Sequence, residues 1–209
     1  MKRYKSIIFD IDGTILNTEK MNLIPLKRLI KEEKNIDMNY EDLLFALALP
    51  GKKTLETLGF EDIESSYDKW VKYVNEYEEG ATLFANIDCV IKDIYSNNIL
   101  CGIVSSKNRA QYDIDFMPTG LHEYMSVVIL EDDTINHKPH PEPLEKVIQK
   151  LKINPEEAIY IGDSLSDYNC AKSCNMDFGL ALWGAKNTMD INAQINLETP
   201  SDLLKLIID

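Results

Sequence analysis

Apolar residues gather in short continuous runs along the chain, and helical patterns separate most of these runs. Five such runs predict strands, at residues 6–11, 99–105, 126–130, 158–162 and 179–183. The runs are apolar at successive positions rather than at alternate ones, which is typical of parallel strands covered on both faces. Three amphipathic stretches predict helices between them, at residues 87–97, 142–151 and 166–174. This alternation predicts an α/β fold with a doubly wound, Rossmann-like parallel sheet.

A long interval without a predicted strand follows the first apolar run. Four candidate helices fill it, at residues 23–33, 40–48, 52–58 and 63–78. We therefore predict an α-helical domain of residues 18–79, inserted into an α/β core made of residues 1–17 and 80–209. The alternative is that the same helices pack directly on the main sheet. A capped helix at residues 199–208 is expected to close the chain.

Composition narrows the classes of function that remain. The 209-residue chain has a formal net charge of −13, which argues against nucleic acid as a partner. No apolar run approaches the roughly 20 residues that a membrane span needs, and the first run is too short for a signal peptide. Cys170 and Cys174 have no second pair to complete a metal site, so we interpret them as small buried side chains. Free thiols without an export signal predict a cytoplasmic protein.

Polar and charged residues stand at or beyond four of the predicted strand ends. They are Asp10, Asp12, Ser105, Lys138, Asp163 and Asp167. In an open α/β sheet, ligands bind at the carboxyl ends of the strands, so these side chains are expected to share one site. Carboxylates, a hydroxyl donor and a lysine are the groups that phosphoryl transfer uses.

Physical chemistry suggests a role for each group. Asp10, at a strand tip, is a candidate nucleophile, and Asp12 lies on the same side of an extended chain and could act as general acid. Neighbouring carboxylates repel each other, and a Mg²⁺ ion shared by Asp10 and Asp163 would relieve that repulsion. Ser105 could donate to a phosphoryl oxygen and Lys138 could balance its charge. Taken singly, the acids after the fourth strand could instead cap a helix, and the lysine could be solvated.

With its motifs in this order, the chain resembles the haloacid dehalogenase superfamily, in its phosphatase branch, over nearly its whole length. The motifs are DIDGT at residues 10–14, IVSSK at 103–107, KPHPEP at 138–143 and GDSLSD at 162–167. The resemblance implies that Asp10 attacks phosphorus and forms an aspartyl-phosphate, while Asp12 protonates the leaving alcohol and then activates water. It also implies Mg²⁺ held by the Asp10 carboxylate, the Asp12 backbone carbonyl and Asp163, with Asp167 supporting from the outer shell.

The same resemblance implies a phosphate-binding group and a cap. Ser105, Ser106 and Lys138 would hold the phosphoryl group. The inserted helices would form a cap that closes over the core and excludes water from the aspartyl-phosphate. Lys52 or Lys53 could face an anionic substrate from that cap, although a solvated helix start would explain these lysines equally well.

Several functions remain compatible with these residues. The favoured one is a Mg²⁺-dependent phosphatase for a small phosphorylated metabolite, as in phosphoglycolate phosphatases. The alternatives are an isomerase resembling β-phosphoglucomutase, a pyrophosphatase, and a non-enzymatic phosphate-binding or receiver-like switch. The mutase tends to carry glutamate where this chain has Gly162, and a receiver domain is shorter and lacks the helical insertion. The sequence leaves the substrate and the oligomeric state open.

Overall fold

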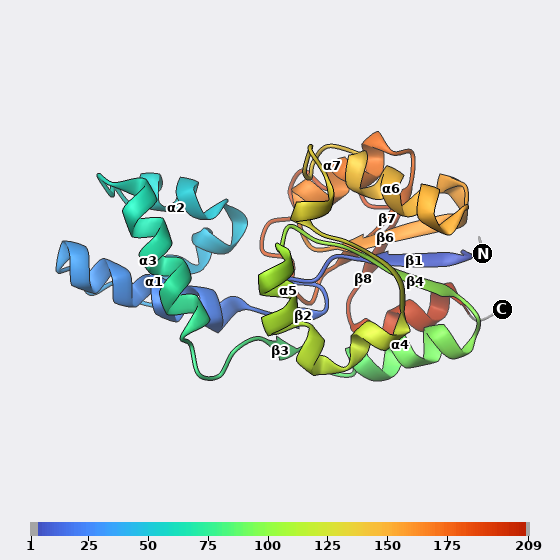
Figure 1. Cartoon of the computed structure of the whole chain (residues 1–209), viewed down its shortest axis with the longest axis horizontal. Helices are drawn as coiled ribbons and strands as arrows, with labels where there is room; N and C mark the ends of the chain where they lie inside the picture. Colours follow the sequence, from blue (N-terminus) through green and yellow to red (C-terminus); the bar gives the residue numbers. More distant parts are fainter. Residues whose placement is uncertain (1–3, 208–209) are drawn as a thin grey trace. The chain divides into compact units, whose positions relative to one another are not determined.

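The computed structural model describes residues 4–207, which divide into two compact units (Figure 1). The first unit combines Met1–Asn17 with Leu83–Asp209, and the second is Thr18–Thr82. Two-residue strands form a small separate sheet close to the points where the chain passes between the units, namely β2 (Leu16–Asn17) and β3 (Thr82–Leu83).

A six-stranded parallel sheet forms the centre of the first unit, in the order β5-β4-β1-β6-β7-β8. The strands are β1 (Ser6–Phe9), β4 (Leu100–Val104), β5 (Met125–Ile129), β6 (Ala158–Gly162), β7 (Asp177–Ala181) and β8 (Ile195–Leu197). Every residue of β1 is buried, as expected for a strand with neighbours on both edges and helices on both faces. The predicted α/β class with a doubly wound parallel sheet is confirmed.

The register of β1 brings three strand ends to the same level. Phe9 pairs with Ile103 of β4 on one side and with Ile161 of β6 on the other. The chain proceeds from β1 outward to β4 and β5, and later returns to the other side of β1 for β6, β7 and β8. The strand order therefore reverses at β1, and such a switch point is where open α/β sheets bind their ligands.

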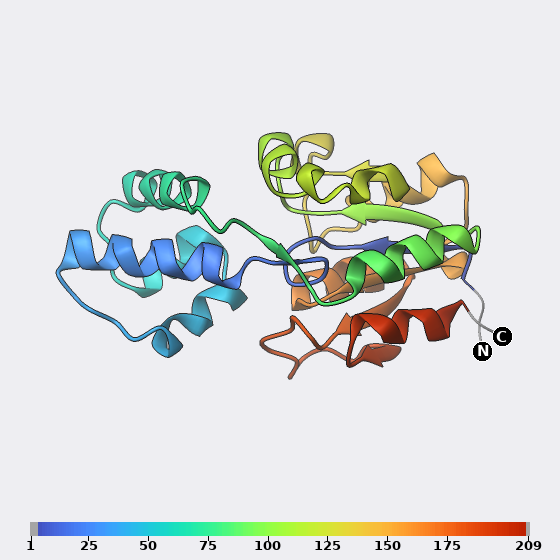
Figure 2. The same cartoon turned by 90° about the horizontal axis from the view of Figure 1, so that it is seen from below.

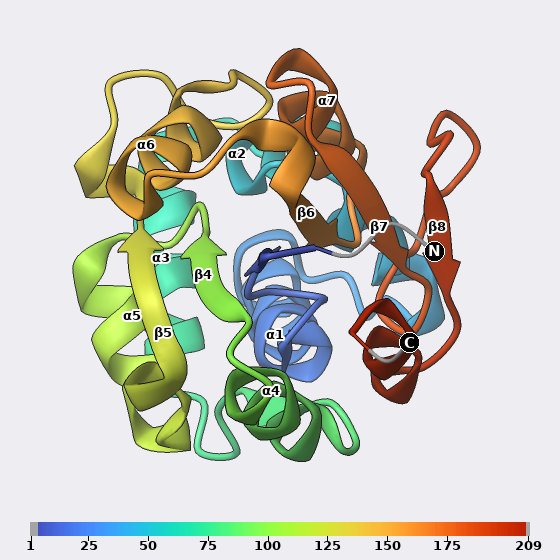
Figure 3. The ribbon, with the colours of Figure 1, turned by 90° about the vertical axis from the view of Figure 1, so that its right-hand side faces the viewer.

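Helices cover both faces of this sheet (Figure 3). One face carries α6 (Glu142–Leu151) and α7 (Leu165–Ser173), and the other carries α4 (Ile87–Ser96) and the 3₁₀ helix η6 (Pro200–Leu206). Helices α4 and η6 lie side by side, as Figure 2 also shows. Apolar side chains of α6 and α7 join those of the strands in one core, which fixes the helices that follow the strand ends.

The second unit is helical and has a core of its own. It contains α1 (Glu19–Lys34), the 3₁₀ helix η1 (Glu41–Ala48), α2 (Gly51–Thr57) and α3 (Ile63–Asn75). Helix α1 buries Leu23, Leu26 and Ile30, whose spacing of three and four residues forms one apolar face. The indole Nε1 of Trp70 on α3 donates to the carbonyl of Asn22 at 3.0 Å, which ties α3 to α1.

A few elements differ from the sequence-based expectation. Residues 40–48, expected to be α-helical, form η1, and the expected closing helix is η6, with residue 208 outside the described chain. Helix α5 (Arg109–Asp115) and strand β8 were not predicted. Within residues 4–207, none of the helices has both the length and the apolar character that crossing a membrane requires.

Candidate active site

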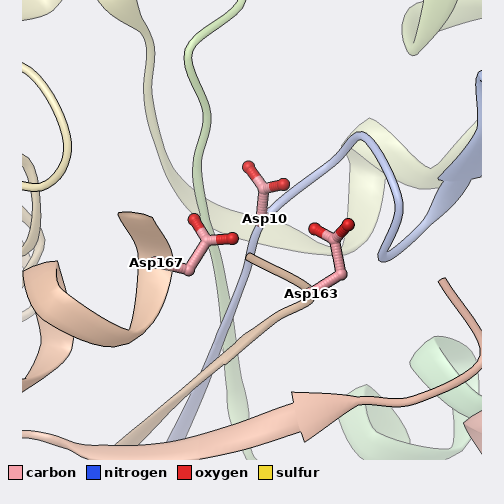
Figure 4. Close-up of side chains that lie close together, drawn as sticks. All are labelled: Asp10, Asp163 and Asp167. Atoms are coloured by element: carbon pink, nitrogen blue, oxygen red, sulfur yellow. The ribbon is translucent and has the colours of Figure 1, made fainter. Parts of the chain in front are cut away.

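Three carboxylates meet at the switch point of the sheet (Figure 4). Asp10 directly follows β1, Asp163 directly follows β6, and Asp167 lies in the first turn of α7. One carboxylate oxygen from each lies within 4.8 Å of the others. The fold therefore brings together three of the acids that the sequence places at strand ends.

Asp10 is the most central of these groups. Its backbone N–H donates to the carbonyl of Ile161 at 2.8 Å, and its Oδ1 accepts a hydrogen bond from Lys138 Nζ at 2.7 Å. Burial, together with the Asp167 and Asp12 carboxylates, raises the pKa of Asp10 to about 7, against the lowering effect of Lys138. One lysine therefore does not compensate the negative charge of this cluster.

Lys138 bridges two of the three carboxylates. Its Nζ donates to Asp10 Oδ1 and, at 2.6 Å, to Asp167 Oδ1, while only 6% of its side chain is exposed. Burial alone would lower the pKa of Lys138, but Asp10 and Asp167 outweigh it and hold the pKa above its ordinary value. Lys138 is therefore a fixed positive charge beside Asp10.

Tyr160 is a member of this site that the sequence analysis missed. Its hydroxyl lies 2.9 Å from the Val104 carbonyl and 3.0 Å from Asp167 Oδ1, and it accepts from Lys138 Nζ at 3.2 Å. Burial raises the pKa of Tyr160 well above its ordinary value, so the phenol remains a donor. The one available signal was a tyrosine inside an otherwise aliphatic buried strand, AIYIG.

Asp163 and Asp167 have different surroundings. Asp167 Oδ1 accepts from Lys138 and Tyr160, and its Oδ2 accepts from the backbone N–H and hydroxyl of Ser164 at 3.1 and 2.5 Å, which completes a capping box on α7. The capping role considered for these acids therefore applies to Asp167. For Asp163, no lysine or arginine of residues 4–207 lies within ion-pair distance, and burial, with Asp167 and Asp10, raises its pKa well above the ordinary value.

This charge distribution fits a divalent cation. Mg²⁺ binds hard oxygen ligands and is usually held by one or two carboxylates together with water. The oxygens of Asp167 are already engaged, whereas Asp10 and Asp163 carry charge that Lys138 does not balance. Asp10 and Asp163 are therefore the carboxylates best suited to bind the ion directly.

A tight turn after β1 lies directly against Asp163. Gly13 has a φ of +79°, and a Cβ at this position would lie 2.1 Å from Asp163 Oδ2. Gly184, in the loop after β7, also lies close to this turn, because a Cβ on Gly184 would lie 1.7 Å from the Gly13 carbonyl oxygen. The indole of the neighbouring Trp183 donates to the Thr14 carbonyl at 2.9 Å. The loop after β7 thus holds the turn against the acidic cluster, and only glycine fits at Gly13.

Lys107 contacts both Asp12, which follows β1, and Ser105, which follows β4. The Asp12 side chain is 39% exposed, and its Oδ1 lies 3.1 Å from Lys107 Nζ. Ser105 is buried at the end of β4, and its Oγ accepts from the Lys107 backbone N–H at 3.3 Å, while Ser106 is exposed. Burial lowers the pKa of Lys107, but the Asp12 and Asp115 carboxylates raise it more, so its net pKa lies above the ordinary value.

The two lysines considered for substrate contact belong to the helical unit. Lys52 Nζ pairs with Glu64 at 2.7 Å, and Lys53 Nζ pairs with Glu56 at 2.9 Å. All four side chains are largely exposed, so these pairs contribute little to stability and could exchange partners readily. A role for Lys52 or Lys53 toward substrate stays a prediction.

Comparison with known proteins identifies the family of this chain. The sequence profile of the haloacid dehalogenase-like hydrolases matches residues 7–181. The chain therefore belongs to the haloacid dehalogenase-like hydrolase family. The family recognised from the four motifs is confirmed, and so is the expectation of an enzyme of the phosphatase type.

Individual relatives extend this similarity over nearly the whole chain. The pyrophosphatase PpaX of Oceanobacillus iheyensis is 28% identical over 189 residues, covering 88% of this chain and 86% of the relative. PpaX of Bacillus cereus strain B4264 is 24% identical and covers 98% and 97%. A Lactobacillus plantarum structure, provisionally named phosphoglycolate phosphatase, has a TM-score of 0.88 at 24% identity and covers 98% and 100%. The β-phosphoglucomutase of Clostridium difficile has a TM-score of 0.73 at 20% identity, covering 96% and 93%.

Proposed function

We propose that this enzyme is a Mg²⁺-dependent phosphatase that hydrolyses small phosphorylated metabolites through an aspartyl-phosphate on Asp10. The observation that carries this proposal is the meeting of Asp10, Asp163 and Lys138 at the switch point of the sheet. A buried carboxylate paired with a lysine, next to an acid without a cation, is suited to bind a phosphoryl group together with a metal ion.

Asp10 and Asp163 would hold the ion, joined by the Asp12 backbone carbonyl that the family resemblance adds. Bound there, Mg²⁺ would offset charge on the phosphoryl oxygens and on the attacking carboxylate. Asp167 would support the site indirectly, because its oxygens already accept from Lys138, Tyr160 and Ser164. Lys138 would remain paired with Asp10, and its positive charge would also attract the phosphoryl oxygens.

The chemistry then needs two displacements at phosphorus. In the first, a carboxylate oxygen of Asp10 forms a bond to phosphorus as the bond to the leaving oxygen breaks, and Asp12 gives its proton to that oxygen. In the second, water attacks the aspartyl-phosphate, Asp12 accepts the proton of the water, and the Asp10 carboxylate is released. Ser105 and Ser106 would donate to the phosphoryl oxygens through these steps.

The helical unit would act as the cap over this site. Closure of such a unit excludes water from a reactive intermediate until the proper water is in place. Lys52 or Lys53 of α2 would supply a positive charge toward an anionic substrate. Substitution of both lysines by methionine should then raise KM for the physiological substrate while leaving kcat unchanged.

Two substrate classes have specific support. The pyrophosphatases among the relatives make pyrophosphate a candidate, beside small phosphomonoesters such as phosphoglycolate. A phosphoryl-transferring mutase has less support, because a Cβ on Gly162 would lie 2.6 Å from Asp167 Cβ. The glutamate that the mutase tends to carry at this position would displace Asp167.

The deciding experiment is a phosphate-release screen of the purified full chain. The panel contains phosphoglycolate, hexose phosphates, nucleotides, p-nitrophenyl phosphate and pyrophosphate, each with Mg²⁺ and each with EDTA. We expect phosphate release with Mg²⁺ only, and the highest kcat/KM identifies the substrate class. Turnover in EDTA would contradict the metal role. Conversion of a sugar phosphate to its isomer without phosphate release would favour the mutase.

A further inference from the structure

Lys107 is the second buried lysine of the core unit, and the proposed mechanism gives it no role. It follows Ser105 and Ser106 at the end of β4, and only 9% of its side chain is exposed. Buried lysines are rare in proteins, and those that occur have paired charges. Lys107 is paired with two carboxylates, of Asp12 and Asp115, neither of which belongs to the three-acid cluster.

One of these pairs fixes Lys107 in the fold. Asp115 Oδ2 accepts a hydrogen bond from Lys107 Nζ at 2.5 Å, and the Asp115 side chain is only 6% exposed. Asp115 is the last residue of α5, which Asn108 and Gln111 start with a capping box. The Lys107 backbone is held as well, because its carbonyl accepts from the Glu131 N–H at 3.0 Å.

The other carboxylate paired with Lys107, that of Asp12, is more exposed to solvent than that of Asp115. Lys107 Nζ lies 3.1 Å from Asp12 Oδ1, although the two groups are not aligned for a hydrogen bond. Within residues 4–207, Lys107 is the one basic side chain at ion-pair distance from Asp12. The Asp12 side chain as a whole is 39% exposed, but its Oδ1 is buried and faces the charge of Lys107.

The two buried lysines therefore serve different acids. Lys138 contacts Asp10 and Asp167, on the side where phosphorus would be attacked. Lys107 contacts Asp12, the group that would exchange protons with the leaving oxygen and then with water. Because Lys107 is itself held by Asp115 at the end of α5, its charge can keep the Asp12 carboxylate in one place. This would serve both the proton transfer to the leaving oxygen and the later one from water.

We propose that Lys107, anchored by Asp115, is a positioning residue that holds the Asp12 carboxylate for proton transfer to the leaving group. This inference rests on the proposed phosphatase mechanism. It requires that loss of Lys107 slows the first displacement only where the leaving oxygen needs a proton. A lysine that instead bound the phosphoryl group would affect all substrates alike.

The test compares leaving groups in the first turnover of the full chain with Mg²⁺. The substrates are p-nitrophenyl phosphate, whose leaving group needs little protonation, and glycerol 2-phosphate, whose leaving group needs a proton. For Lys107→Met we expect a loss of about 10- to 100-fold in the first-turnover rate with glycerol 2-phosphate, part of the range general acids contribute. The p-nitrophenyl ester should lose less than about threefold, and KM should stay within about threefold for both.

A double-mutant cycle with Asp12→Asn separates positioning from a general structural effect. Once the proton donor is gone, adding Lys107→Met should change the rate by less than about twofold, because the two residues act as one unit. Lys150→Met, at an exposed lysine of α6, is the matched control and should behave as wild type. Additive losses in the cycle, equal losses with both esters, or a rise in KM alone would each overturn the inference.

A second variant keeps the test decisive if Lys107→Met does not fold. Asp115→Asn retains the side-chain shape but removes the charge that anchors Lys107, and we expect the same leaving-group pattern with a smaller loss. A wild-type chain that releases phosphate from no substrate of the panel with Mg²⁺, these two esters included, refutes the proposed function, and this inference with it. A wild-type chain that is active and depends on Asp12, together with an Asp115→Asn variant equal to wild type on both esters, refutes the Lys107 inference alone.

Discussion

At the scale of single residues, the buried carboxylates of the core unit have few basic partners. Asp10 and Asp167 share Lys138, Asp12 and Asp115 share Lys107, and Asp163 has no basic partner among residues 4–207. Breaking a buried ion pair by removing one member typically costs about 3–5 kcal/mol, because the other charge stays buried. Substitutions here therefore need a stability measurement beside the activity assay.

For the proposed nucleophile, we predict that Asp10→Asn removes p-nitrophenyl phosphate hydrolysis and leaves folding nearly intact. Asparagine keeps the side-chain volume, and Lys138 retains its 2.6 Å hydrogen bond to Asp167. The pKa of Asp10 is already raised to about 7 by burial, so loss of its charge costs the fold little. Thermal unfolding should show a midpoint within about 3 °C of wild type.

The matched control for this variant is Asp93→Asn, at an exposed aspartate of α4. It should keep full activity. More than a few per cent of residual activity in Asp10→Asn would show that another group attacks phosphorus.

At the scale of elements, the turn after β1 matters as much as the strand itself. Gly13 lies between Asp163 on one side and the backbone around Gly184 on the other, and it carries the chain from β1 toward the second unit. The turn can therefore adopt its conformation only without a side chain at this position. The geometry of this turn is therefore linked to the position of Asp163, a proposed metal ligand.

We predict that Gly13→Ala loses at least about tenfold in activity, whereas Gly120→Ala does not. Both glycines have a positive φ, of +79° and +73°, so either substitution should cost about 1–2 kcal/mol of backbone strain. A Cβ at Gly13 would also displace Asp163, while nothing lies within 4 Å of a Cβ at Gly120. Initial rates over a range of Mg²⁺ concentrations should show weaker metal binding in Gly13→Ala. Equal activity in the two variants would contradict this reading.

Much of the core unit could be predicted from the sequence, because its buried strands are continuous apolar runs. β1, β4 and β6 fall within predicted runs, β5 and β7 overlap theirs but begin one and two residues earlier, and α6 matches its predicted bounds. Strand β8 has three residues and α5 has seven, which is too short to show a hydrophobic period. Tyr160 and Lys107 were visible in the sequence, in AIYIG and IVSSK, but their roles depend on contacts with distant residues such as Lys138 and Asp12.

At the scale of the whole molecule, the division into two units separates the residues proposed for the reaction from those proposed for substrate contact. The acids and lysines of the proposed site all lie in the first unit, whereas the candidate substrate contacts Lys52 and Lys53 lie in the second. Exchange of the second unit between relatives should therefore change substrate preference rather than reaction type.

The four cysteines provide a test of the whole fold. Burial raises the pKa of Cys101 and Cys170 to about 12 and that of Cys174 to about 11, whereas Cys89 is exposed. A raised pKa leaves almost no thiolate at pH 8, and the thiolate is the reactive form. We predict that a thiol reagent at pH 8 labels one cysteine rapidly in the native protein and all four after denaturation. Rapid native labelling of Cys170 would contradict the packing of α7.

The position of β1 in the sheet has a consequence for protein synthesis. Ser6–Phe9 leaves the ribosome before its partner strands, which are made of Leu100–Val104 and Ala158–Gly162. At about 5–20 residues per second, roughly 8–30 s pass before the second partner is made. During this interval the apolar SIIF segment has at least one unpaired edge, which is a hazard for aggregation. The strand that leads into the proposed nucleophile therefore needs protection from other chains until its partner strands are made.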